Sequence, residues 1–489
     1  MKTISTVKQQ IRAQQKHRHF PTVDYAERVS HLDPDSEFHD FRGFYVLFWV
    51  GLAMMVITTV VRNIKDTGHP FRVHTWSLLT ADVLQLAIAD VCMVGTTVLA
   101  LPMHFVYKNS RGWMQWGRGG MFFHSFFQMG WLILWIWLPF VLGWSWTAQV
   151  FFTLHTLTIL MKLHSWAFYN GHLSETERRL RALDQPEGAS RTEAVRYPSV
   201  SGNIPENSPE RRRQSDHRHQ QHHHPHPQSI SSLRDDLATE LTSPMGAIAY
   251  PANLTLANFT DYLLCPTLCY ELQYPRTKKF RPLELFGKTA AIFGCIFLLV
   301  VISEEFIIPI TNEAAINLEL ASKFSDKALL LAETISLLLF PFMITFLLVF
   351  LVIFEYVLGA FAEITGFADR RFFQDWWNST DWLEFSREWN IPVHNFFRRH
   401  VYSASLPHLS RSAATLITFL ISSLAHELVM ACITKKIRGY GFFAMMMQLP
   451  IVMVQRSRWV RSKKTFSNVF FWISIILGLS VMCAFYVLV

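Results

Sequence analysis

A histidine and a glutamate, His426 and Glu427, are adjacent about midway along an apolar run from Ala413 to Met430. Ionisable side chains inside a membrane span are costly unless they face protein or water, so their default interpretation is functional. A neutral imidazole, with an ordinary pKa of about 6.5, can accept the proton of an alcohol. Paired with an amide donor, it would suffice for acyl transfer from a thioester to a hydroxyl, because a thiolate leaves easily. A structural histidine that only hydrogen-bonds a neighbouring helix is the alternative. Other apolar runs also contain polar groups, namely Asp90, His124, His155 and Glu333.

The segment before this run, residues 366–402, is too charged to cross a bilayer, yet it carries four tryptophans at 376, 377, 382 and 389. Amphipathic aromatic side chains at this density suit a bilayer interface or the wall of a groove. Composition alone favours the simpler alternative, an interfacial helix pair that only anchors the fold.

The composition of the whole chain indicates a polytopic membrane protein. Apolar residues make up 51% and aromatic residues 14% of the 489 residues, while charged residues reach only 17%, against ~25% in ordinary soluble proteins. This excludes a water-soluble enzyme, a disordered protein and a disulfide scaffold. The net charge of +8 comes without a nucleic-acid motif, so nucleic acid is not an expected partner. Basic loops beside apolar runs are typical of the cytosolic face of a membrane protein.

Apolar runs long enough to cross about 30 Å of hydrocarbon recur along the chain. The run from Met121 to Tyr169 is too long for one crossing, and we expect it to break at Gly143. The predicted fold is an all-α polytopic membrane protein of about nine transmembrane helices. We place them near residues 43–61, 83–106, 121–143, 147–168, 288–311, 329–358, 412–433, 440–456 and 467–489.

Composition divides the chain into four parts. Residues 1–42 are polar and basic without a cleavable signal, so we expect a cytosolic N-terminal segment. Residues 43–168 contain the first four helices, and residues 250–489 contain the other five together with the 366–402 segment. Residues 169–249 include a Ser/Pro/Arg/Gln/His tract that cannot bury enough apolar surface to fold, which predicts a disordered insert. Lys and Arg are concentrated on the side of this insert, which we assign to the cytosol.

A histidine-rich tract at residues 217–226 raises a hypothesis from another class, a metal transporter. Clustered imidazoles can bind zinc, and transporters carry such tracts between spans. Transport would also need ligands at helical spacing inside the membrane, and no apolar run shows His-x-x-x-Asp or His-Glu-x-x-His. We therefore expect a solvated linker and no metal site, with the transporter as the remote alternative.

Residues 372–378, Phe-Phe-Gln-Asp-Trp-Trp-Asn, resemble the FYxDWWN motif of the sterol O-acyltransferase branch of the membrane-bound O-acyltransferase family. Phe373 replaces the tyrosine of that motif, which indicates packing rather than catalysis at this position. The resemblance covers roughly residues 40–170 and 250–489. Other similar stretches are Trp389-Asn-Ile-Pro-Val-His394, Ser422-Ser-Leu-Ala-His-Glu427 and residues 262–276, which resemble a PTLxYExxYPR segment.

The resemblance implies roles for individual residues, position by position. His426 would be the general base for the acceptor hydroxyl, and Asn390 a donor that holds or polarises the acyl carbonyl. The motif residues implicated in acyl-CoA binding and structural integrity are Phe372, Asp375, Trp376, Trp377 and Asn378. Positions expected along the path of the CoA and the acyl chain are Arg387, Trp389, His394, Tyr402, Arg411 and Ser422.

The resemblance also implies substrates and setting. A long-chain acyl-CoA would be the co-substrate and a sterol the acceptor, with no further cofactor, inside a chamber that the transmembrane helices enclose. It implies the endoplasmic-reticulum membrane and a homodimer or homotetramer. Residues 161–169 and 391–402 look more like fungal sterol enzymes, which makes ergosterol or a precursor the expected sterol. A diacylglycerol O-acyltransferase, which shares the chamber and the histidine, is the alternative within the family.

Overall fold

The computed structural model describes residues 20–33, 36, 42–71, 77, 80–184, 230–244, 246–457, 460 and 463–488. These residues are helical almost throughout, and extended pairing among them is limited to isolated bridges. Seven of their helical stretches are long and apolar enough to cross a membrane. The prediction of an all-α polytopic membrane fold is therefore confirmed.

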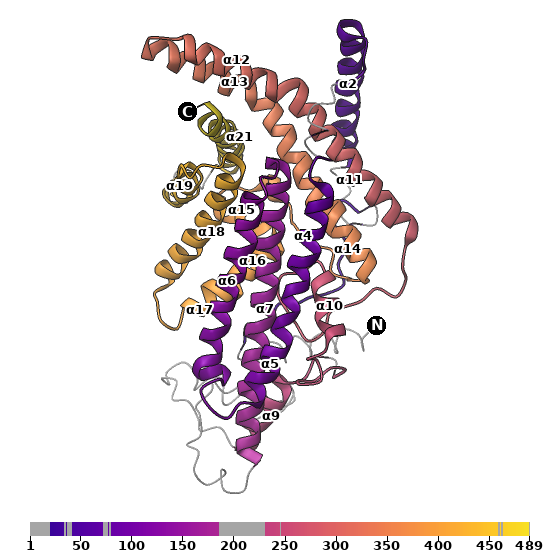
Figure 1. Ribbon diagram of the computed structural model, residues 1–489, viewed down its shortest axis with the longest axis vertical. Helices are drawn as coiled ribbons and strands as arrows, with labels where there is room; N and C mark the ends of the chain where they lie inside the picture. Colours follow the sequence, from indigo (N-terminus) through magenta and orange to yellow (C-terminus); the bar gives the residue numbers. More distant parts are fainter. Residues whose placement is uncertain are drawn as a thin grey trace, which may run out of the picture.

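Helices from the first half of the chain stand side by side around α7 (purple, Figure 1). They are α4 (Val83–Thr96), α5 (Ala100–Asn109), α6 (Met121–Val141) and α7 (Trp146–Asp184), with a 3-10 turn at Thr97–Leu99 and a π-helical turn at Trp116–Gly120. Gly143 has a φ of +65° between α6 and α7, a conformation that favours glycine. The predicted break in the long apolar run is thus confirmed.

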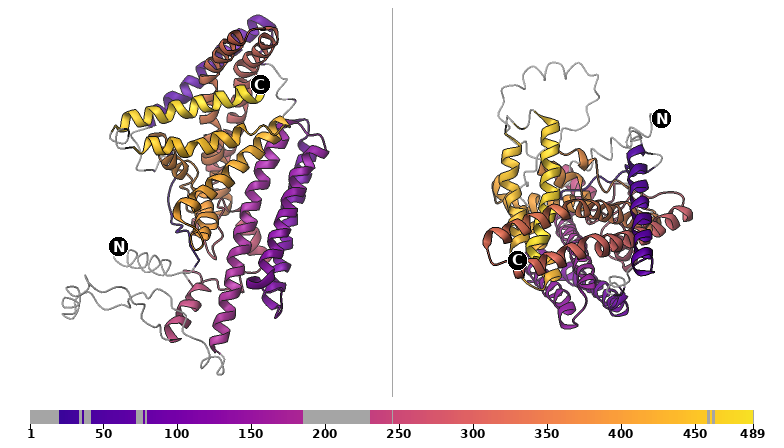
Figure 2. Two further views of the ribbon diagram at one scale, coloured as in Figure 1. Left: turned by 90° about the vertical axis from the view of Figure 1, so that its left-hand side faces the viewer. Right: turned by 90° about the horizontal axis from the view of Figure 1, so that it is seen from above.

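The other long helices come from the N-terminal end and the second half of the chain. They are α2 (Arg42–Thr67), α11 (Pro282–Ile302), α12 (Ile308–Leu320), α13 (Phe324–Phe350), α14 (Leu358–Thr365), α18 (Arg411–Thr434), α19 (Tyr440–Gln455) and α21 (Lys464–Leu488). Two π-helical segments, Ser303–Ile307 and Leu351–Val357, join α11 to α12 and α13 to α14. α18 packs against both α7 and α19, and α13 packs against α21. Of the C-terminal helices, α18 therefore lies against the α4–α7 group (Figure 2).

The expected count of nine spans is not established. The described residues of all nine predicted segments are helical apart from a few at the ends, but only seven stretches among them are both long and apolar enough to span a membrane. α19 is apolar but has 16 residues. α7 has 39 residues but buries polar side chains such as Gln149, Lys162 and Asn170. A helix enclosed by other helices does not need an apolar surface, because its polar groups find partners within the protein.

Apolar side chains cover the outside of the long helices. Leu84, Phe126 and Phe286 are each more than 70% exposed, and they come from α4, α6 and α11. Large exposed apolar surfaces on soluble monomers are rare, so these faces fit contact with lipid.

The predicted bounds of the insert, residues 169–249, include folded residues at both ends. α7 continues as a helix to Asp184, and its residues Leu173 and Thr176 are buried. On the far side, α9 (Ile230–Glu240) packs against α7, where His172 contacts Glu240 at 2.6 Å. Both flanks of the 169–249 prediction therefore belong to the folded protein, and residues 185–229 lie outside the described residues.

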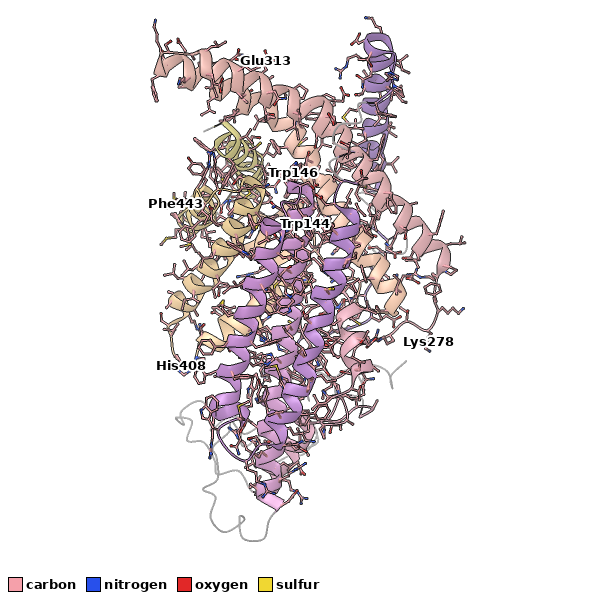
Figure 3. The ribbon with its side chains drawn as sticks, in the orientation of Figure 1. Trp144, Trp146, Lys278, Glu313, His408 and Phe443 are labelled. Carbon is pink, nitrogen blue, oxygen red and sulfur yellow. The ribbon has the colours of Figure 1, made fainter. Side chains whose placement is uncertain are left out.

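Residues that should lie on opposite membrane sides are separated along the long axis. Trp144, Trp146 and Glu313 lie toward the top of the molecule, whereas His408 and Lys278 lie lower, on the side of α9 (Figure 3). His408 and Lys278 therefore lie toward the same end of the molecule as α9, which follows the insert in the chain. The assignment of that side to the cytosol stays a prediction.

Candidate active site

The FYxDWWN-like motif follows the C-terminus of α14, which is capped by a glycine. Gly366 follows α14 with a φ of +66°, the left-handed cap that favours glycine. Its carbonyl accepts a hydrogen bond from the Thr277 N–H at 2.7 Å, and the Ala368 N–H donates to the Pro275 carbonyl at 3.0 Å. Two stretches that are distant in sequence and resemble one family are thus direct neighbours.

Two backbone hydrogen bonds hold the motif against the residues around Asn390. The Gln374 N–H donates to the Glu388 carbonyl at 2.9 Å, and the Ile391 N–H donates to the Phe372 carbonyl at 3.0 Å. These bonds flank Asn390 on both sides. The position of Asn390 therefore depends on the conformation of the motif.

Aromatic rings pack the other face of the motif. Trp376 is 1% exposed and its ring centroid lies 4.9 Å from Trp389 and 5.0 Å from Phe350 of α13. From α21, the Trp472 indole and the Asn468 amide both donate to the Trp377 carbonyl, at 3.1 and 2.9 Å. Aromatic pairs of this kind add to packing stability, so Trp376 and Trp377 hold the motif against α13 and α21.

The remaining motif positions also have structural contacts. Phe372 and Phe373 are buried, and the ring centroid of Phe373 lies 4.7 Å from Phe350, as a packing role requires. The Asn378 N–H donates to the Asp375 carbonyl at 2.9 Å, which closes the short 3-10 turn at Trp376–Asn378.

Asn390 is the N-cap of α16 (Ile391–Phe397). Its Oδ1 accepts a hydrogen bond from the Val393 N–H at 3.1 Å, the usual contact of an N-cap asparagine. Its Nδ2 makes no hydrogen bond within the described part of the chain, so this N–H₂ group is available to a ligand. The side chain is half-buried, with one end fixed by the fold.

His394 lies one turn further along α16, between two guanidinium groups. Burial and then the nearby charges of Arg387 and Arg398 together lower the pKa of His394 to about 4. Arg387 is in α15 (Trp382–Glu388) and Arg398 begins the π-helical turn Arg398–Tyr402; both are exposed. His394 is therefore neutral at pH 7, and the positive charge here comes from arginine. Burial also raises the pKa of Glu388 to about 7, with Asp375 and Glu384 adding to the shift.

His426 lies on α18 and is exposed on the protein surface. Its Nδ1 lies 2.7 Å from the Ser422 carbonyl oxygen. A carbonyl can only accept, so this contact assigns the ring proton to Nδ1 and leaves the Nε2 lone pair free to take a proton. The arrangement provides a base.

Glu427 has a different role from its neighbour. Its two carboxylate oxygens accept hydrogen bonds from the backbone N–H groups of Gly439 (2.7 Å) and Phe442 (3.1 Å) and from the Tyr486 hydroxyl (2.8 Å). The two N–H groups lie at the N-terminus of α19, where a carboxylate is favoured, and Tyr486 belongs to α21. Glu427 thus joins α18 to α19 and is not free to assist His426.

The structure gathers the predicted site residues into two groups. The first group contains the motif together with Arg387, Trp389, Asn390 and His394. The second group lies on α18 and contains Ser422, His426 and, in the first turn of the helix, Arg411. α18 packs against the π-helical turn that contains Tyr402, which joins the two groups. The best-defined cavities of the described residues, about 40 and 10 Å³, contain neither His426 nor Asn390. The enclosing chamber stays a prediction.

Residues 131–488 match the sequence model of the membrane-bound O-acyltransferase family. This chain belongs to the membrane-bound O-acyltransferase family. It is 37% identical to the "Probable sterol O-acyltransferase 2" of Schizosaccharomyces pombe over 92% of this chain and 87% of that one. It is 32% identical to "Sterol O-acyltransferase 2" of Candida albicans, over 96% of this chain and 78% of that one. The likeness to "Diacylglycerol O-acyltransferase 1" of Dictyostelium discoideum, 32% identity, covers 50% of this chain and 39% of that one.

Sequence reasoning missed a buried arginine of this family member. Arg399 is 4% exposed; it contacts Glu271 at 3.1 Å and donates to the Tyr270 carbonyl at 2.9 Å. Glu271 belongs to the family-like stretch at residues 262–276, but nothing in the sequence pairs it with Arg399. An arginine amid the aromatic 391–402 segment was the available hint.

Proposed function

We propose that this chain is a sterol O-acyltransferase that transfers a long-chain acyl group from acyl-CoA to the 3-hydroxyl of a sterol. The observation that carries the proposal is the state of His426: a histidine on a membrane-spanning helix, with Nδ1 hydrogen-bonded to its own helix and Nε2 unoccupied. The sterol O-acyltransferases named above, similar over nearly the whole chain, support the substrate class.

In the proposed reaction, His426 Nε2 takes the proton of the sterol hydroxyl while the hydroxyl oxygen attacks the thioester carbonyl. The carbonyl electron pair moves onto oxygen, where the Asn390 Nδ2–H group stabilises the developing charge. The intermediate collapses, the C–S bond breaks, and CoA leaves as the thiolate. The proton on His426 then passes to the sulfur, which regenerates the base. Because a thiol has a pKa of about 8.5, its thiolate leaves without further activation, so we propose that no metal or cofactor takes part.

The charged groups beside Asn390 fit the CoA end of the co-substrate. Arg387 is exposed, and guanidinium groups bind phosphates well. His394, neutral at pH 7, would contribute hydrogen bonds and shape. Trp389, Tyr402, Arg411 and Ser422 would line the path between the two groups of site residues.

The setting of the enzyme is also a proposal. The multi-pass helical fold and the sterol acceptor suit the endoplasmic-reticulum membrane, and we expect a homodimer or homotetramer. Mass photometry of the detergent-solubilised protein would distinguish these assemblies from a monomer.

The test supplies the purified protein with oleoyl-CoA and either a sterol or diacylglycerol. We expect steryl ester with ergosterol and little triacylglycerol. Product with diacylglycerol alone would replace this proposal by the second candidate, which the partial likeness to the Dictyostelium relative favours.

A further inference from the structure

The N-terminal residues 20–30, termed here the strap, are fastened to the protein by buried carboxylates. Three carboxylates from different parts of the chain each accept one hydrogen bond from a strap N–H group, and the three donors are spaced three residues apart. These hydrogen bonds run from Phe20 to Glu240 (3.1 Å), from Val23 to Glu271 (3.0 Å) and from Ala26 to Asp369 (3.1 Å). Backbone donors spaced in this way fix the path of an extended chain.

The three carboxylates that bind the strap are buried and therefore need hydrogen-bond or charged partners. Glu240, Glu271 and Asp369 are 2%, 7% and 8% exposed. A buried carboxylate is costly unless hydrogen bonds and opposite charges compensate it. Burial raises the pKa of Asp369, whereas Arg28 and the Ala26 N–H oppose that shift. The strap therefore supplies part of what opposes the rise in the pKa of Asp369.

The strap also pairs directly with the chain that leads into the motif. The Arg28 N–H donates to the Ala368 carbonyl at 3.1 Å, and the Arg370 N–H donates to the Arg28 carbonyl at 2.8 Å. Phe372, two residues on, holds Ile391 through its carbonyl. A contact path thus runs from the strap through residues 368–372 to the residue next to Asn390.

A cavity of about 40 Å³ marks the same junction. Tyr25 and Arg28 of the strap line one side, and Phe372, Ile391 and Pro392 line the other. The strap thus lines the same cavity as both partners of the Phe372–Ile391 hydrogen bond. The second anchor, Glu271, contacts Arg399 in the turn that packs against α18.

We propose that Asp369 and Glu271 are positioning residues through which the strap holds Asn390 and the Arg398–Tyr402 turn in their catalytic arrangement. The proposal rests on the proposed function, because it assigns the strap to the same site. It differs from a purely structural role, in which the loss of a strap contact would lower stability without acting through Asn390.

The test is a matched proline pair in the full-length chain. Ala26→Pro removes the N–H group that Asp369 accepts, whereas Glu27→Pro removes an N–H group that makes no hydrogen bond within the described residues. We expect Ala26→Pro to lower kcat at least tenfold, with KM for acyl-CoA and the melting temperature little changed, and Glu27→Pro to stay near the wild-type rate. Equal effects of the two variants would overturn the proposal.

A double-mutant cycle separates positioning from general damage. In an Asn390→Ala background, Ala26→Pro should cost less than twofold, because its effect passes through the missing side chain. A full tenfold loss in that background would show that the strap acts elsewhere. Should Ala26→Pro fail to fold, Asp369→Asn and Asp369→Leu replace it: asparagine retains an acceptor for the Ala26 N–H and should keep most of the rate that leucine loses. Similar rates for these two would contradict the assignment.

Hydrogen–deuterium exchange tests the strap independently of the reaction. Residues 20–28 should be protected in the wild-type protein, and Asp369→Leu should speed exchange both there and near residues 388–393. Fast exchange of the strap in the wild type would refute the positioning role. Absence of steryl ester from a wild type with a protected strap would instead refute the proposed function.

Discussion

The two ends of the Asn390 side-chain amide have different roles: Oδ1 caps a helix, and we propose that Nδ2 donates to the substrate. Oδ1 caps α16, so Asn390→Asp keeps the cap while it removes the Nδ2 donor and adds negative charge where the oxyanion forms. We expect a loss of about 10²–10³-fold in kcat with an unchanged melting temperature. Asn390→Ala should lose the cap as well and be less stable by about 1 kcal/mol. Steady-state rates and thermal unfolding of both variants check this; an active Asn390→Asp enzyme would exclude Asn390 as the oxyanion donor.

His394 should make stability depend on pH. Its pKa in the folded protein is about 4, below the ordinary 6.5, through burial and then the charges of Arg387 and Arg398. Between these two values the unfolded chain binds the proton more readily, so stability is complete above pH 6.5 and is lost as the pH falls toward 4. His394→Gln should flatten the melting temperature over this window. An unchanged pH profile would mean that His394 titrates normally.

At the scale of elements, α9 sets the limit of what can be removed from the insert. Leu233 and Leu237 of α9 are buried against the folded part, and Glu240 contacts His172. We expect deletion of residues 187–229 to leave expression and esterification largely intact, and deletion of residues 187–235 to lower the melting temperature because it removes half of α9. Complete loss of specific activity in a well-folded 187–229 deletion would make the insert part of the catalytic machinery.

The sequence predicted elements better than the contacts between them. Apolar runs placed the long helices of the described residues, and the motif at residues 372–378 indicated the family, because both signals depend only on residues that are close together in the sequence. The end of α7 was missed since its last turns are polar outside and buried only through α9. The strap could not be predicted from the sequence, because its carboxylate anchors bind backbone N–H groups, which every residue except proline carries. Likewise, the capping role of Glu427 exists only once α19 begins beside α18.

At the scale of the whole molecule, the orientation can be tested by glycosylation. Asn253, Asn258 and Asn378 are in acceptor sequons, and all three lie on the side that we assign to the cytosol. Asn253 is 1% exposed and its Nδ2 donates to Asn170 and Tyr270, so the folded protein cannot present it. We expect no mass shift after endoglycosidase treatment. A shift that Asn258→Gln or Asn378→Gln abolishes would invert the orientation.

Steryl ester formation by purified His426→Ala tests the central claim, that His426 is the base of an acyl transfer to a sterol. Alanine is well tolerated within a helix, so the variant should insert and assemble normally and bind acyl-CoA with similar affinity. Its rate with oleoyl-CoA and ergosterol should fall by about 10²–10⁴-fold, whereas His394→Ala should mainly raise KM for acyl-CoA. Near wild-type turnover by His426→Ala, beside an inactive His394→Ala, would contradict the account.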